Sequence, residues 1–142
     1  MSRIDETKEF LPVRIAVLTV SDTRNKDTDT SGTCLADRAA SAGHRIVEHC
    51  IVRDDVVAIR EAVARWIASD EVDVILTTGG TGFSPRDMTP EAIKPLFSRE
   101  MEGFSAVFHQ VSFRTVGVST LQSRAFAGQA GDTFIFCIPG ST

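Results

Sequence analysis

The sequence predicts an α/β fold, a three-layer α/β/α sandwich around a mostly parallel sheet, and two observations support this prediction. Apolar runs that suit buried strands alternate with segments of helical periodicity, as in sheets whose faces are both covered by crossover helices. Polar or glycine-bearing segments follow the apolar runs at Ser21, Asp54, Gly79 and Pro139. Because the carboxyl ends of parallel strands meet at one edge of a sheet, these segments are expected to build one pocket.

Two strands and two helices are expected in the first half of the chain, at residues 14–20, 29–42, 45–52 and 56–69. Asp29 or Thr30 is expected to cap the first helix, and Gly43 to end it. Asp54 or Asp55 is expected to cap the second helix. That helix is predicted strongly, because apolar side chains recur on one face of a 3.6-residue period.

The second half predicts strands at 72–76, 116–118 and 132–138, helices at 89–97 and 102–113, and a polar turn with a small helix at 119–125. Thr89 is expected to cap the helix that it begins, since Pro90 suits the first helical position. The segment at residues 140–142 is typical of the end of a strand followed by the N-cap of a helix. A further helix, beyond the residues given, is therefore expected to cover the sheet.

Composition indicates one globular domain at residues 13–142, preceded by a polar lead-in at residues 1–12. The chain has 142 residues, 42% of them hydrophobic and 24% charged, which is ordinary for such a domain. The net charge of −4 favours neither nucleic acid nor an anionic membrane as a partner, and no apolar run approaches the roughly 20 residues of a membrane span. The three cysteines show no metal-site or redox spacing, so we expect free thiols and a cytoplasmic protein.

The glycine-rich segment after the strand at 72–76 is the strongest candidate for a binding site. Gly79, Gly80 and Gly82 stand between a strand and a helix, where backbone N–H groups can converge on a phosphate. The alternative is a tight connection that binds nothing. The segment matches neither the Walker A pattern, which needs a Gly-Lys-Ser/Thr triplet, nor the dinucleotide fingerprint, because Pro85 occupies the third glycine position.

Two carboxylates, Asp54 and Asp87, each lie between a strand and a helix. A pair of carboxylates could hold Mg²⁺ over phosphates, because this ion takes one or two carboxylates and completes its shell with water and substrate oxygens. The alternatives are a helix cap at Asp54 and, at Asp87, an exposed loop carboxylate paired with Arg86. Spacing alone leaves both interpretations open. Further polar side chains at strand exits and turns are candidates for binding, although each alone is more often part of a turn; they are Ser21, Asp22, Ser31, Ser123 and Ser141.

The sequence resembles the MoaB/MogA family of molybdenum-cofactor biosynthesis proteins, and is most similar to the MoaB branch. The motifs that carry the resemblance lie at residues 18–24, 29–32, 77–82, 86–92, 99–104 and 139–141. The glycine loop followed by Asp-x-Thr-Pro-Glu-Ala is specific as a combination and weak in its parts.

The resemblance implies a protein that assembles as trimers or hexamers, binds molybdopterin, and transfers AMP from Mg-ATP to the terminal phosphate of molybdopterin. In this interpretation Gly79, Gly80, Thr81 and Gly82 cradle phosphate, and Asp54 and Asp87 form the acidic pair that the metal and catalysis need. Ser21, Asp22, Gly140 and Ser141 would line the pocket for nucleotide or pterin. The alternative is a MoaB-type protein that binds molybdopterin without catalysis. The presence of aspartate at both positions 54 and 87 favours the enzyme.

Overall fold

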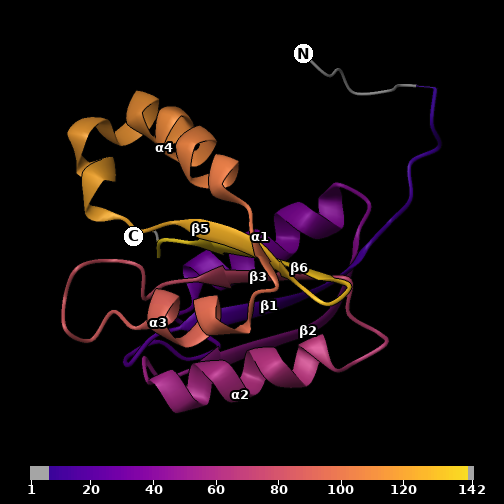
Figure 1. Ribbon diagram of the computed structural model, residues 1–142, viewed down its shortest axis with the longest axis horizontal. Coiled ribbons are helices and arrows are strands. Elements are labelled where there is room, and N and C mark those ends of the chain that lie inside the picture. Colours follow the sequence, from indigo (N-terminus) through magenta and orange to yellow (C-terminus); the bar gives the residue numbers. More distant parts are fainter. Residues whose placement is uncertain (1–6, 141–142) are drawn as a thin grey trace.

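The computed structural model describes residues 7–140, which form one six-stranded sheet between helices (Figure 1). The strands, in their order across the sheet, are β2 (Arg45–Val52), β1 (Arg14–Val20), β3 (Val74–Thr78), β6 (Thr133–Ile138), β5 (Phe126–Ala130) and β4 (Arg99–Glu100). The first four run parallel, whereas β5 and β4 are antiparallel to their neighbours. The predicted α/β architecture with a mostly parallel sheet is confirmed.

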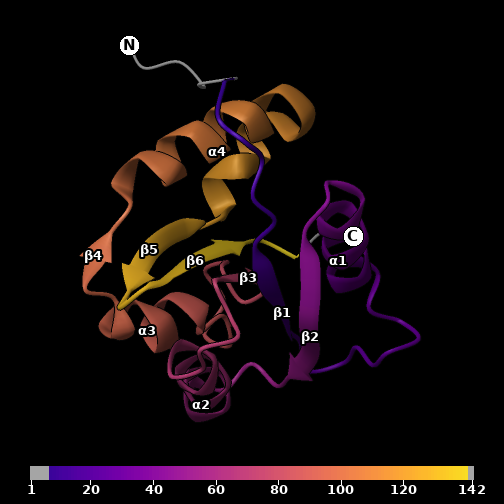
Figure 2. The ribbon, with the colours of Figure 1, turned by 90° about the vertical axis from the view of Figure 1, so that its right-hand side faces the viewer.

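Helices cover both faces of this sheet. On one side lie α1 (Thr30–Ser41) and α4 (Glu102–Val116), and on the other lie α2 (Val56–Ile67) and α3 (Thr89–Ile93), as Figures 1 and 2 show. Alternate residues of β1 serve the two sides, because successive side chains of a strand point to opposite faces. Leu18 is buried in the core beneath α2, whereas Ile15 and Val17 pack with Ala39 of α1.

A carboxylate fastens α2 to the edge strand β2. Glu48 accepts hydrogen bonds from Cys50 (2.8 Å to Sγ), Trp66 (3.1 Å to Nε1) and Arg65 (3.1 Å to Nη2). These donors, with Cys50 contributing most, lower the pKa of Glu48 from its usual 4.5 to about 2. The helix is therefore held by a charged contact as well as by its apolar face.

The strand expected at 116–118 is wrong, and the second half of the chain differs from the prediction at two further places. Residue 116 belongs to α4, and the segment predicted as a strand continues as a 3₁₀ helix, Gly117–Gln122. The helix expected at 89–97 divides into α3 and a 3₁₀ turn, Lys94–Leu96. Neither β4 nor β5 was expected, since Phe126–Ala130 is rich in glycine and alanine and lacks the branched side chains typical of strands.

The expected helix caps are mostly confirmed. Asp29 and Asp55 cap α1 and α2, each accepting a hydrogen bond of 2.9 Å from a backbone amide of the first turn. Thr89 does not cap α3: the capping position is Met88, and the Thr89 hydroxyl donates to the carbonyl of Gly79 (2.9 Å). That bond ties the glycine-rich loop to the helix that follows it.

No helix between residues 7 and 140 has the length and apolar character needed to cross a bilayer. The three cysteines are free thiols, as expected, with Cys137 fully buried and Cys50 half-buried.

Candidate functional site

The ends of four parallel strands meet at one edge of the sheet, as the sequence predicts. The amide of Ser21, after β1, donates to the carbonyl of Val52 at the end of β2 (2.9 Å). The amide of Gly79, after β3, donates to the carbonyl of Ile138 at the end of β6 (3.1 Å). Segments far apart in the chain therefore share one rim, where ligands of parallel α/β sheets bind.

The glycine-rich loop, residues 79–82, presents backbone donors at this rim. Gly79 and Gly80 have φ angles of +99° and +71°, a region that residues with a side chain rarely adopt. The Gly79 amide is used within the sheet. The amides of Gly80, Thr81 and Gly82 donate to no protein acceptor among residues 7–140, so they remain available to an anion.

Asp54 lies beside this loop. A Cβ atom at Gly80 would be 3.2 Å from Asp54 Oδ2, while Oδ1 accepts a hydrogen bond from the Met88 amide (3.0 Å). Burial raises the pKa of Asp54 against the lowering effect of the Met88 amide, and the charges of Asp87 and Asp22 raise it further. A cation between these carboxylates would relieve that repulsion.

Asp87 approaches the other end of the loop. A Cβ atom at Gly82 would lie 2.7 Å from Asp87 Oδ2, the oxygen that also accepts from the Ser84 amide (2.9 Å). The alternative pairing with Arg86 is wrong: Arg86 Nη2 lies 2.7 Å from Asp22 Oδ2. A hydrogen bond from the backbone amide of Asp54 and the contact with Arg86 lower the pKa of Asp22. Both oxygens of the Asp22 carboxylate therefore contact protein partners.

A small hollow of about 170 Å³ opens beside the loop. It brings together four of the residues that were expected to bind ligand, namely Ser21, Ser31, Gly79 and Gly140. The Ser21 side-chain oxygen accepts from the amides of Thr23 and Arg24 (3.2 and 3.0 Å), so this residue also shapes the turn after β1. Ser141 lies outside the described residues.

Arg24 also lines the small hollow, although it is not among the residues that were predicted to bind ligand. It belongs to the motif at residues 18–24, and the available signal was a cation in the polar exit of a strand.

Ser123 lies elsewhere, on the far side of the glycine-rich loop. It lines a hollow of about 630 Å³ together with Glu91, Lys94 and His109. Its hydroxyl oxygen is buried and has no hydrogen-bond partner within the part of the chain that the structure describes. The adjacent Arg124 connects this hollow to the loop, because its amide donates to the carbonyl of Thr81 (2.7 Å) and its side chain donates to the carbonyls of Gly82 (2.9 Å) and Asp87 (2.7 Å).

The residues at the rim fit Mg²⁺ by their chemistry. Across residues 7–140 no group of three or more His, Cys, Asp or Glu side chains is arranged to hold a metal ion by itself. Mg²⁺ needs fewer, since it binds through one or two carboxylates and takes its other ligands from water and phosphate. Asp54 and Asp87 supply such carboxylates. Both carboxylates lie close to the loop, because Gly80 and Gly82 have no side chain that would crowd them.

Comparisons with known proteins identify the family. Residues 16–142 match the family described as "Probable molybdopterin binding domain". The chain is 56% identical over 134 residues to molybdenum cofactor biosynthesis protein B of Escherichia coli strain K12, which covers 94% of this chain and 79% of that protein. A crystal structure of a molybdenum cofactor biosynthesis protein B matches with a TM-score of 0.90 and 39% identity, covering 94% of this chain and 84% of that one. A structure of MogA matches with a TM-score of 0.82 and 30% identity, covering 90% and 84%.

The family, the sequence identity and the fold agree with the motifs at the strand ends. The chain therefore belongs to the molybdopterin-binding domain family of molybdenum cofactor biosynthesis proteins, and within it is related to both MoaB and MogA.

Proposed function

We propose that this protein binds molybdopterin and transfers AMP from Mg-ATP to its terminal phosphate. The observation that supports this most directly is the placement of Asp54 and Asp87 against Gly80 and Gly82, beside three backbone amides with no protein acceptor within residues 7–140. Donors for phosphate and ligands for a divalent cation thus lie on one rim. A site that only bound a neutral ring would need neither.

The reaction joins an oxygen of the molybdopterin phosphate to the α-phosphorus of ATP. The new P–O bond forms as the bond from the α-phosphorus to the oxygen bridging the β-phosphate breaks, and pyrophosphate leaves with the bonding electron pair. Such transfers depend on alignment of the two phosphates and on neutralisation of their charge, so no covalent nucleophile is required. Mg²⁺ held by Asp54 and Asp87 would supply part of that neutralisation.

The protein's own groups then have separate tasks. The amides of Gly80, Thr81 and Gly82 orient phosphate oxygens without side-chain entropy, because the loop is fixed by the bonds of Thr89 and Arg124. The hollow on the far side, of about 630 Å³, has room for a fused-ring substrate, and the small hollow of about 170 Å³ has room for a phosphate group. The two substrates can thus approach the loop from its two sides.

The test is to incubate the purified protein with molybdopterin and Mg-ATP, and to measure adenylylated pterin and pyrophosphate. We expect both products in equal amounts, and none without Mg²⁺. Molybdopterin that binds without forming either product would show that the protein binds pterin without catalysis.

We propose further that copies of this chain associate through α4. Among residues 102–116 of this helix none is fully buried, although the helix is largely apolar. Apolar side chains stay exposed along it and the following 3₁₀ helix: Val107, Val111, Phe113, Val116, Val118 and Leu121. Large apolar side chains exposed in such number on one segment are typical of a contact with another protein surface. The trimers or hexamers implied by the resemblance would provide that contact.

A further inference from the structure

We propose that Arg24 makes the small hollow beside the glycine-rich loop a binding site for a phosphoryl group. This inference rests on the proposed function and adds a residue to its site. The hollow lies between the exit of β1, the first turn of α1 and Gly140. Among the described residues that line it, Arg24 is the only cation.

The guanidinium group of Arg24 is positioned but not neutralised. The Nη1 atom of Arg24 donates to the carbonyl of Thr28 (3.0 Å), and the backbone amide of Arg24 donates to Ser21 Oγ (3.0 Å). Within residues 7–140 it forms no ion pair with a carboxylate. A guanidinium has five N–H donors in a rigid planar arrangement that matches the oxygens of a phosphate. Most of these donors are therefore available to a ligand.

The segment that carries Arg24 is itself fixed. The Asn25 side chain accepts from the amides of Asp27 (2.9 Å) and Thr28 (3.1 Å), which closes a tight turn. Because these bonds fix the turn, Arg24 is held near the hollow before a ligand binds, which lowers the entropic cost of binding.

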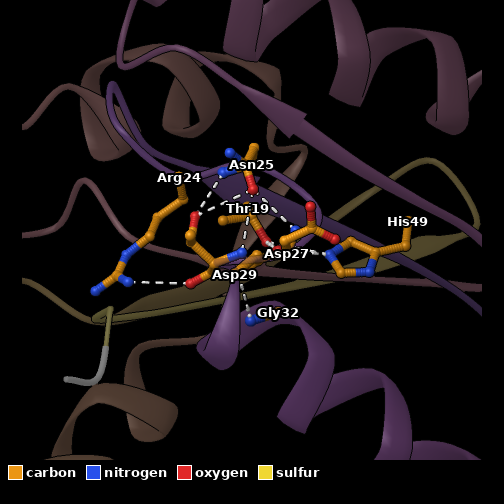
Figure 3. Close-up of polar contacts among 8 residues, drawn as sticks. Thr19, Arg24, Asn25, Asp27, Asp29, Gly32 and His49 are labelled. Atoms are coloured by element: carbon orange, nitrogen blue, oxygen red, sulfur yellow. Dashed lines mark hydrogen bonds and ion pairs between the residues drawn. The ribbon is translucent and has the colours of Figure 1, made fainter.

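A buried polar network fastens the end of this segment to the sheet. Asp29 is 3% exposed, and its Oδ2 accepts from Thr19 Oγ1 of β1 (2.6 Å) and lies 2.9 Å from His49 Nε2 of β2 (Figure 3). Its Oδ1 accepts from the Gly32 amide of α1 (2.9 Å). A Cβ atom at Gly32 would collide with the side chains of Thr19, Asp29 and His49, so the network requires glycine there.

Charge and size together indicate the ligand. Of the residues between 7 and 140 that line the small hollow, Asp29 is the one carboxylate, and its oxygens contact Thr19, His49 and Gly32. The oxygens of Asp29 are thus directed at protein partners, whereas the guanidinium of Arg24 keeps donors available to an anionic ligand. A volume of about 170 Å³ has room for a phosphate group.

The test compares the wild type with Arg24→Gln, Arg24→Lys and Lys26→Gln in calorimetric binding of inorganic pyrophosphate, ATP, adenosine and molybdopterin. Lys26 is the matched control, because it is exposed on the same segment and does not line the small hollow. We expect Arg24→Gln to weaken pyrophosphate binding about tenfold or more, because a charge-assisted contact is lost, and to leave adenosine binding unchanged. The pyrophosphate affinity of Arg24→Lys should lie between those of the wild type and Arg24→Gln, and the affinity of Lys26→Gln should equal that of the wild type.

The remaining substrates identify the source of the phosphate. A parallel loss of ATP affinity assigns the phosphoryl group to the nucleotide, and a loss confined to molybdopterin assigns it to the pterin. The inference is overturned if Arg24→Gln binds pyrophosphate as tightly as the wild type does. It is also overturned if Lys26→Gln weakens pyrophosphate binding as much as Arg24→Gln does. Arginine-dependent pyrophosphate binding by a protein that makes no adenylylated pterin would refute the proposed function and leave this site standing.

Discussion

Gly82 makes room for Asp87: a Cβ atom at position 82 would lie 2.7 Å from the Oδ2 atom of that carboxylate. A Cβ atom at Gly80 would collide first with the Thr89 hydroxyl and would lie 3.2 Å from Asp54 Oδ2. Gly80 also needs its positive φ angle, whereas Gly82 has an ordinary backbone conformation. The role of Gly82 is therefore to admit a carboxylate to the loop, and this can be tested without straining the backbone.

We predict that Gly82→Ala lowers the rate of adenylyl transfer about 100-fold with little loss of stability, because the new methyl group displaces Asp87 by a fraction of an ångström to about one ångström. The measurement is turnover together with thermal unfolding. Gly103→Ala is the matched control, since a Cβ atom at Gly103 meets nothing within 4 Å. Equal rates for the two variants would mean that the position of Asp87 does not matter.

We predict that Asp54→Asn lowers the turnover rate at least about 100-fold, yet raises the melting temperature of the protein at pH 7. Burial and repulsion raise the pKa of Asp54 in the folded protein, so its charge opposes folding once the pH exceeds the ordinary value of 3.8. The increase in melting temperature that Asp54→Asn causes should therefore be present at neutral pH and vanish near pH 3. A melting temperature that falls at pH 7 would contradict this assignment of the charge.

We predict that Glu48→Gln destabilises the fold by about 1–2 kcal/mol at pH 7, a discounted figure because the Glu48 side chain is 38% exposed. The pKa of Glu48 is lowered from 4.5 to about 2, so its contribution is complete above about pH 4.5 and is lost as the pH falls toward 2. Urea unfolding of both proteins across this range measures the difference. Glu61→Gln, at an exposed position of α2, is the control for removing a glutamate charge without these hydrogen bonds.

We predict that Val107→Asp dissociates the assembly, because it places a charge on the apolar surface of α4. Val57→Asp is the control: both valines are 60% exposed, but Val57 lies on α2. Sedimentation velocity should show trimers or hexamers for the wild type and the control, and smaller species for Val107→Asp. A wild type that sediments as a monomer would exclude association through α4.

The sequence predicts well those features that depend on local periodicity. The buried strands β1, β2, β3 and β6 and the amphipathic helix α2 follow from apolar patterns, and the convergence of their ends follows from parallel connectivity. The strand β5 could not be predicted, because its glycine and alanine residues are selected by packing: a Cβ atom at Gly128 would collide with the ring of Phe97. That contact joins residues far apart in the chain.

The candidate site was predictable in part for the same reason. Asp54 and Asp87 were indicated by their places after strands, whereas their contacts with Gly80 and Gly82 depend on how the loops fold together. Ser123 lies on the opposite side of the loop from Ser21, a separation that position along the chain does not reveal. The role of Arg24 depends on Thr28, Asp29 and His49, which bring it to the hollow through three-dimensional contacts.

The most direct measurement is a double-mutant cycle on adenylyl transfer with Asp87→Asn, Asp54→Asn and the double variant, with molybdopterin affinity measured in parallel. If the two carboxylates hold one ion over one pair of phosphates, either substitution disables the same unit, and the double variant will be scarcely slower than the worse single variant while molybdopterin still binds. Rate losses that multiply, or an Asp87→Asn variant as fast as the wild type, would contradict a shared site.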